Sequence, residues 1–141
     1  MPATVTQFRP DAWPLASILK LGTPPRSVST ARQHTAVTLS EWNLAHLADD
    51  AQIVVSELVT NALVHGAGPV MVRLRANPES LLIEVCDALA TPPEPRHHAA
   101  DAECGHGLEI VSALCDSWGC YPDSSGKVVW ALTGSRTATG G

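Results

Sequence analysis

Hydrophobic positions change their spacing along the chain, and each change marks an expected element. Residues 28–42 carry apolar or small side chains at intervals of three and four, which predicts a helix. The same spacing over residues 51–65 predicts a second helix, for which Asp49 and Asp50 are N-cap candidates and Gly66 is a plausible residue just past the end. Its core face would consist of Ala51, Val55, Leu58, Val59 and Ala62. A third, shorter helix is expected over residues 108–115.

Strand-like patterns lie between and around these helices. Residues 70–75 alternate between apolar and polar side chains, and residues 81–87 follow after a turn-forming segment. Further strands are expected at residues 16–21, 117–121 and 127–133. This order of elements predicts an α+β fold, a two-layer sandwich in which three helices cover one face of a mixed, mostly antiparallel sheet.

Composition suggests one domain between two tails. Thr, Pro, Ala and Gly are frequent in residues 1–14 and 135–141, so we expect flexible tails there and a single folded domain over residues 15–134. Residues 88–104 contain three prolines and no periodic pattern, which is typical of a functional or disordered loop. No apolar run approaches the length of a membrane span, so we expect a cytoplasmic protein without a membrane partner.

The charge of the chain limits its possible partners. The formal net charge is −5, whereas proteins that bind nucleic acid concentrate Lys and Arg. We therefore expect no direct contact with nucleic acid. The cysteines show no CxxC spacing, and in the cytosol we expect them to be reduced. They are Cys86, Cys104, Cys115 and Cys120.

A polar stripe crosses the second helix, because Glu57, Asn61 and His65 are spaced four residues apart. A glutamate one turn from an asparagine can serve phosphoryl transfer. The carboxylate can accept a proton from an attacking hydroxyl, and the amide oxygen is a suitable ligand for Mg²⁺. The alternative is the solvated face of an ordinary amphipathic helix, and the spacing alone favours that alternative. For His65 alone, an interaction with the helix C-terminus is favoured over a ligand role.

Two other segments carry candidate binding residues. Asp87 ends a strand, where its carboxylate could accept a hydrogen bond from an amino group such as that of adenine, or could simply belong to a turn. Gly105 and Gly107 precede the third helix, where backbone N–H groups could hold phosphates or the chain could simply hinge. The sequence contains no P-loop motif.

The order and spacing of these segments resemble the GHKL superfamily of ATP-binding domains, which have the Bergerat fold. The matching segments are ELVTNA from Glu57, a strand that closes with Asp87, GHGLEIV from Gly105, and the pair Trp118-Gly119. The resemblance covers roughly residues 25–133. It looks closest to the bacterial anti-sigma-factor serine/threonine kinases.

This resemblance implies roles for the matching residues. Glu57 would be the catalytic general base, Asn61 the Mg²⁺ ligand, and Asp87 the residue that binds adenine. Further contacts to ATP would come from Gly105, Gly107 and Leu108. Residues 88–104 would form a lid over the nucleotide.

The resemblance also implies partners. The chain would phosphorylate a serine or threonine of an anti-sigma antagonist protein, and the antagonist would compete with a sigma factor for the chain, which would be a homodimer. Two departures bear on turnover. Ala88-Leu89-Ala90 stands where the family often has glycines, and Val128 stands near a position that often carries a hydroxyl.

Two alternatives remain open. The chain could be an ATP-sensing module that binds partners with little catalysis. A metal site could also form from the residues His97, His98, Cys104 and His106, although their spacing matches no closed zinc pattern.

Overall fold

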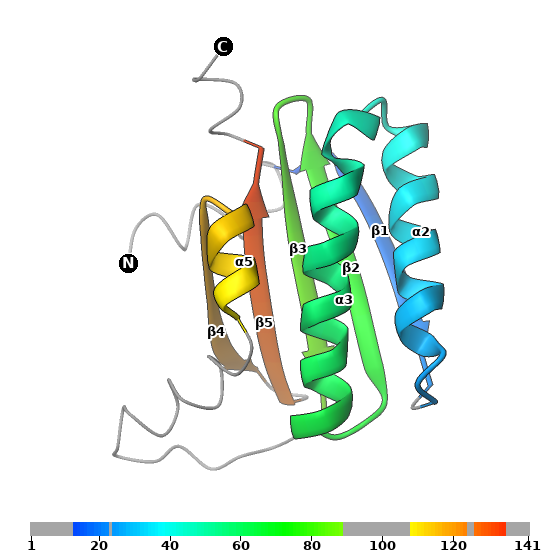
Figure 1. Ribbon diagram of the computed structural model, residues 1–141, viewed down its shortest axis with the longest axis vertical. Helices are drawn as coiled ribbons and strands as arrows, with labels where there is room; N and C mark the ends of the chain where they lie inside the picture. The colour runs from blue at the N-terminus through cyan, green and yellow to red at the C-terminus, as the bar shows by residue number, and fades with distance from the viewer. Residues whose placement is uncertain (1–12, 23, 89–107, 124–125, 135–141) are drawn as a thin grey trace.

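The computed structural model of the protein describes residues 13–22, 24–88, 108–123 and 126–134 (Figure 1). In chain order the elements are β1 (Leu15–Leu21), α2 (Ser27–Glu41), the 3₁₀ helix η2 (Ala45–Leu47), α3 (Ala48–His65), β2 (Val70–Asn77), β3 (Ser80–Asp87), α5 (Glu109–Leu114), β4 (Ser117–Asp123) and β5 (Gly126–Thr133). Each helix and strand expected from the sequence is present, and the observed ends differ from the expected ones by a few residues.

The five strands form one sheet in the order β1-β2-β3-β5-β4, and every described pair of neighbours is antiparallel. Figure 1 shows α2, α3 and α5 on the same face of this sheet. This arrangement confirms the predicted two-layer α+β sandwich. Because β5 pairs with both β3 and β4, the end of β3 lies beside the start of β5 in the part of the sheet that α3 covers.

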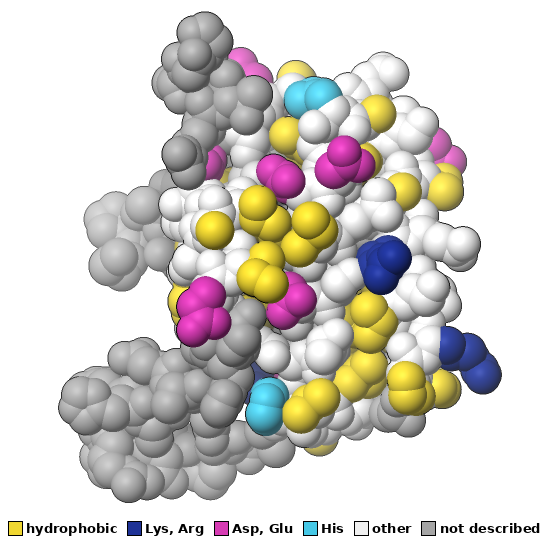
Figure 2. All heavy atoms as spheres, in the orientation of Figure 1, with side chains coloured by type: hydrophobic (Ala, Val, Ile, Leu, Met, Phe, Trp, Pro, Cys, Tyr) yellow, Lys and Arg dark blue, Asp and Glu magenta, His cyan; other side chains and the backbone are white. Residues whose placement is uncertain are grey.

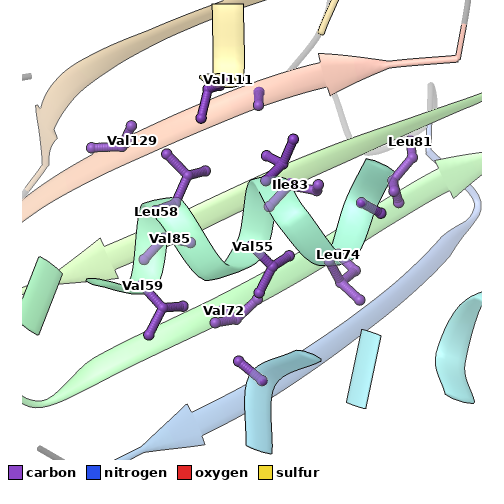
Figure 3. Close-up of a cluster of buried hydrophobic side chains, with 14 of the residues drawn as sticks. Val55, Leu58, Val59, Val72, Leu74, Leu81, Ile83, Val85, Val111 and Val129 are labelled. Carbon is purple, nitrogen blue, oxygen red and sulfur yellow. The ribbon is translucent and has the colours of Figure 1, made fainter. Parts of the chain in front are cut away.

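Alternating side chains fill the space between sheet and helices. Burial alternates along β2, whose inner side chains are buried while its outer ones are partly exposed. The core face predicted for α3 is buried at all five positions. Figure 3 shows apolar side chains of α3 pointing at those of β2 and β3, and each such buried side chain stabilises the fold by about 1.5–3 kcal/mol. The labelled side chains include Val55, Leu58, Val72, Ile83 and Val85.

The start of α3 differs from the prediction. We expected Asp49 or Asp50 to cap the helix, but the helix begins at Ala48 and both aspartates lie in its first turn. Leu47 takes the capping position without a side-chain hydrogen bond. The reason is η2, because a 3₁₀ turn leads directly into α3 and leaves no extended residue before it. The aspartates instead interact favourably with the positive end of the helix dipole.

The face of the sheet that points away from the helices contains a buried carboxylate that the sequence analysis did not single out. Glu84 of β3 is 1% exposed, and its Oε1 lies 3.0 Å from Arg75 Nε and 3.2 Å from Arg73 Nε. Arg73 is the cross-strand partner of Glu84. The two guanidinium groups therefore neutralise a carboxylate that has lost its water. Close to this group, a second apolar cluster is formed by Trp13, Leu82 and Trp130.

The cysteines only partly follow the expectation of reduced thiols. Cys86 and Cys115 are free and buried, and burial raises the pKa of Cys86 to about 11 and that of Cys115 to about 12, which keeps both thiols protonated. Cys120 is disulfide-bonded, so the expectation is wrong there. Cys104 lies outside the described residues. None of the described helices is both long and apolar enough to cross a bilayer.

The ion pairs of Glu84 give a test of the outer face. We expect Glu84→Gln to lower the free energy of unfolding by about 2 kcal/mol, because two partly buried guanidinium groups lose their counter-charge. Urea unfolding followed by circular dichroism measures the change. The matched control is Glu79→Gln, at an exposed turn, which we expect to stay within about 0.5 kcal/mol of the wild type. Equal stability of the two variants would contradict this account of Glu84.

Candidate functional site

The polar stripe of α3 lies at the border between the core and the surface. Glu57 and Asn61 are partly buried, and His65, at the last position of the helix, is exposed. The neighbouring Leu58 and Ala62 are buried against the sheet. The stripe therefore does not lie on the fully solvated face of the helix, as one alternative interpretation of the sequence required.

Asp87 is the last residue of β3, and its side chain is 2% exposed. It lies directly opposite Lys127 in the β3–β5 pair, and Lys127 Nζ is 3.8 Å from Asp87 Oδ2. Side chains of cross-strand partners point to the same face of a sheet. That face is the one covered by α3, so the carboxylate and the ammonium lie under the C-terminal half of the helix.

These side chains share one small pocket between α3, β3 and β5. Asn61 and His65 come from α3, Asp87 from β3, and Lys127 from β5. Apolar side chains complete the lining, and they are Leu58, Ala62, Val85 and Val129. The cavity between these side chains is small in this structure, about 10 Å³, so a flat heterocycle would enter only where the pocket widens. Its aliphatic walls and the polar groups at one end are the kind of lining that such a ligand needs.

Two glycines allow the backbone to close around Asp87. A Cβ atom at Gly66 would lie 2.5 Å from Asp87 Oδ2 and 2.7 Å from the carbonyl oxygen of Ala62, so no side chain fits there. Gly126 has a φ of +151°, and a Cβ there would collide with the carbonyl oxygen of Asp87. The end of α3 and the start of β5 are therefore packed directly against the end of β3.

Gly66 plays a different part from the one expected. The sequence analysis placed it just past the helix, a position where glycine commonly adopts left-handed geometry. In the structure Gly66 is extended, with φ −101° and ψ −158°, so it needs no left-handed freedom. What position 66 requires is the absence of a side chain beside Asp87. The backbone N–H of Ala88 donates to the carbonyl oxygen of Ala67 at 2.7 Å, which fastens this loop to the end of β3.

Glu57 lies one helical turn before Asn61 and outside the pocket lining. A turn of α-helix advances about 5.4 Å, so a ligand with one end at Asp87 and an extended form along α3 would pass Asn61 and then reach Glu57. Within the described part of the chain, the Glu57 side chain makes no hydrogen bond or ion pair. Its carboxylate is thus available to a ligand or substrate that approaches from the helix side.

The segment after the loop is described only from Leu108 onward. Leu108 precedes α5, is 1% exposed, and belongs to the main apolar core together with Leu58. Gly105, Gly107 and residues 89–104 of the expected lid lie outside the described residues, as do His97, His98 and His106 of the metal alternative. The described residues contain no group of three potential metal ligands among His, Cys, Asp and Glu.

Lys127 is the member of this pocket that the sequence analysis did not identify. Nothing in the sequence around Lys127 marks it as a site residue. It becomes a neighbour of Asp87 only because β5 pairs with β3 in this register. His65 also lines the pocket, although the sequence favoured an interaction with the helix terminus.

The chain resembles one known protein family over most of its length. No curated protein matches the chain significantly. The family described as the histidine kinase-like ATPase domain matches residues 23–132, which is most of the chain. The matched segment contains all three helices of the layer that covers the sheet, together with Asn61, Asp87 and Lys127. The chain therefore belongs to the histidine kinase-like ATPase domain family.

Proposed function

We propose that this domain binds ATP with Mg²⁺ between α3 and the sheet and acts as a serine/threonine protein kinase of the anti-sigma-factor type. The observation that carries the proposal is the convergence of Asn61 and Asp87, from α3 and β3, on one pocket with apolar walls. The family match over residues 23–132 supports ATP as the ligand.

The residues of the pocket fit the two ends of a nucleotide. The aliphatic side chains Leu58, Val85 and Val129 would pack against the adenine ring, and the Asp87 carboxylate would accept a hydrogen bond from its amino group. Because position 66 carries no side chain, that carboxylate can lie directly against the backbone at the end of the helix. Nearer the middle of α3, the side-chain oxygen of Asn61 would hold a Mg²⁺ ion, which would supply positive charge to neutralise the phosphates.

Glu57 is the residue that we propose to act on the acceptor. The proposed role of its carboxylate is to orient the serine or threonine hydroxyl of the protein substrate and to accept its proton. The partly buried position beside apolar residues and the lack of a described partner support this role. Because α3 is a rigid element packed on the sheet, the separation between Glu57 and Asn61 is fixed by the helix itself.

The helix side of the molecule offers a surface for a protein substrate. Ile53 lies one turn before Glu57 and is 44% exposed, and Ile110 of α5 is 46% exposed. Figure 2 shows hydrophobic and acidic side chains intermingled over α3 and α5. We propose that an anti-sigma antagonist protein and a sigma factor compete for this chain, which would act as a homodimer.

A second candidate function is an ATP-sensing module that captures partners with little catalysis. The observation in its favour is also Glu57, since among the described residues no group orients its carboxylate. A general base in an efficient site is usually held in place by hydrogen bonds. The two candidates share the nucleotide pocket and differ only in whether phosphoryl transfer occurs.

Substitution of Glu57 separates the two functions. We expect Glu57→Gln to lower phosphoryl transfer to an anti-sigma antagonist by about 100-fold or more, because the amide cannot accept the proton, and to leave ATP binding unchanged. Transfer is measured with radiolabelled ATP, Mg²⁺ and a panel of antagonist proteins. Glu41→Gln, at the exposed end of α2, is the control and should retain full transfer. Partner binding by the wild type without any transfer would favour the module instead.

Substitution of Asn61 tests the proposed metal ligand. We expect Asn61→Ala to weaken ATP binding about tenfold in the presence of Mg²⁺, and to have little effect when the metal is removed with EDTA. Isothermal titration calorimetry measures both affinities. Gln33→Ala, at an exposed position of α2, controls for the loss of an amide. An equal loss of affinity with and without Mg²⁺ would show that Asn61 contributes to binding by another route.

A further inference from the structure

Lys127 is held inside the nucleotide pocket rather than extended into solvent. Only 15% of its side chain is exposed, and it lines the same pocket as Asn61 and Asp87. A partly buried ammonium loses hydration, and a nearby carboxylate offsets that loss. The pairing with Asp87 thus explains why a lysine can occupy this position.

The distance between the two charges leaves the ammonium free to donate. At 3.8 Å, Lys127 Nζ and Asp87 Oδ2 form an ion pair but exceed the length of a hydrogen bond. Within the described ranges the ammonium makes no hydrogen bond, and it has three N–H donors. The polar end of the pocket therefore presents a donor and an acceptor side by side.

Adenine carries the complementary pair along one edge. Its amino group donates, and the adjacent ring nitrogen N1 accepts. We propose that Lys127 is a specificity-determining residue that donates a hydrogen bond to N1 of adenine while Asp87 accepts one from the amino group. The inference rests on the proposed ATP binding and adds to it a second side chain that contacts the base.

The same pair of side chains disfavours guanine. Guanine has an oxygen where adenine has its amino group, and an N–H where adenine has the N1 acceptor. If the base keeps its position, an acceptor would face the Asp87 carboxylate and a donor would face the Lys127 ammonium. Mismatches of this kind leave buried polar groups without partners and lower affinity strongly. Lys127 would thereby contribute to rejection of GTP as well as to binding of ATP.

The test compares ATP with 1-deaza-ATP, in which a C–H group replaces N1. Calorimetry on the full chain measures both affinities for the wild type, for Lys127→Met and for Lys20→Met. Lys20 is the other lysine of the sequence and is exposed on β1, so it is the matched control. We expect the wild type and Lys20→Met to bind ATP at least about tenfold more tightly than 1-deaza-ATP, and Lys127→Met to bind both equally weakly.

Three outcomes would overturn the inference while leaving ATP binding intact. They are equal affinity of the wild type for ATP and 1-deaza-ATP, undiminished discrimination by Lys127→Met, and GTP binding as tight as ATP binding. A wild type that binds no ATP would instead overturn the proposed function itself. If circular dichroism shows that Lys127→Met is unfolded, Lys127→Gln replaces it, and its weaker, neutral donor should give a smaller discrimination than the wild type.

Discussion

The end of α3 and the end of β3 approach each other too closely to admit a side chain at position 66, and the pocket depends on that contact. The Asp87 carboxylate lies against the backbone of Gly66, and Ala88 donates a hydrogen bond to Ala67. On the other side of β3, Gly126 lets β5 begin directly beside Asp87. These contacts place residues of α3, β3 and β5 around one small volume.

The central strand β3 is buried on both faces, and each face contains a buried carboxylate. The two carboxylates differ in the basic side chains that neutralise them. On the outer face, the Glu84 carboxylate forms close ion pairs with Arg73 and Arg75. On the inner face, Asp87 has a lysine at a distance too long for a hydrogen bond. The first arrangement stabilises the sheet, whereas the second leaves the N–H donors of the Lys127 ammonium available to a ligand.

The hydrophobic pattern was sufficient to predict the elements and their layers, because helix and strand periods are local properties of a sequence. It also placed Asn61 on a helix edge and Asp87 at a strand end. What it could not provide was the order of the strands, since the pairing of β3 with β5 joins segments far apart in the chain. Lys127 became a neighbour of Asp87 only through that register. Glu84 was similarly hidden, because its burial depends on arginines from β2 that the pattern placed on an outer face.

The central claim is that a nucleotide lies between α3 and the β3–β5 part of the sheet. A crystal structure of the full chain with a non-hydrolysable ATP analogue and Mg²⁺ tests it most directly. The account predicts the adenine amino group within hydrogen-bond distance of Asp87 and the metal ion at the side-chain oxygen of Asn61. A nucleotide bound elsewhere, with the pocket of Asn61, Asp87 and Lys127 still filled by protein side chains alone, would contradict it.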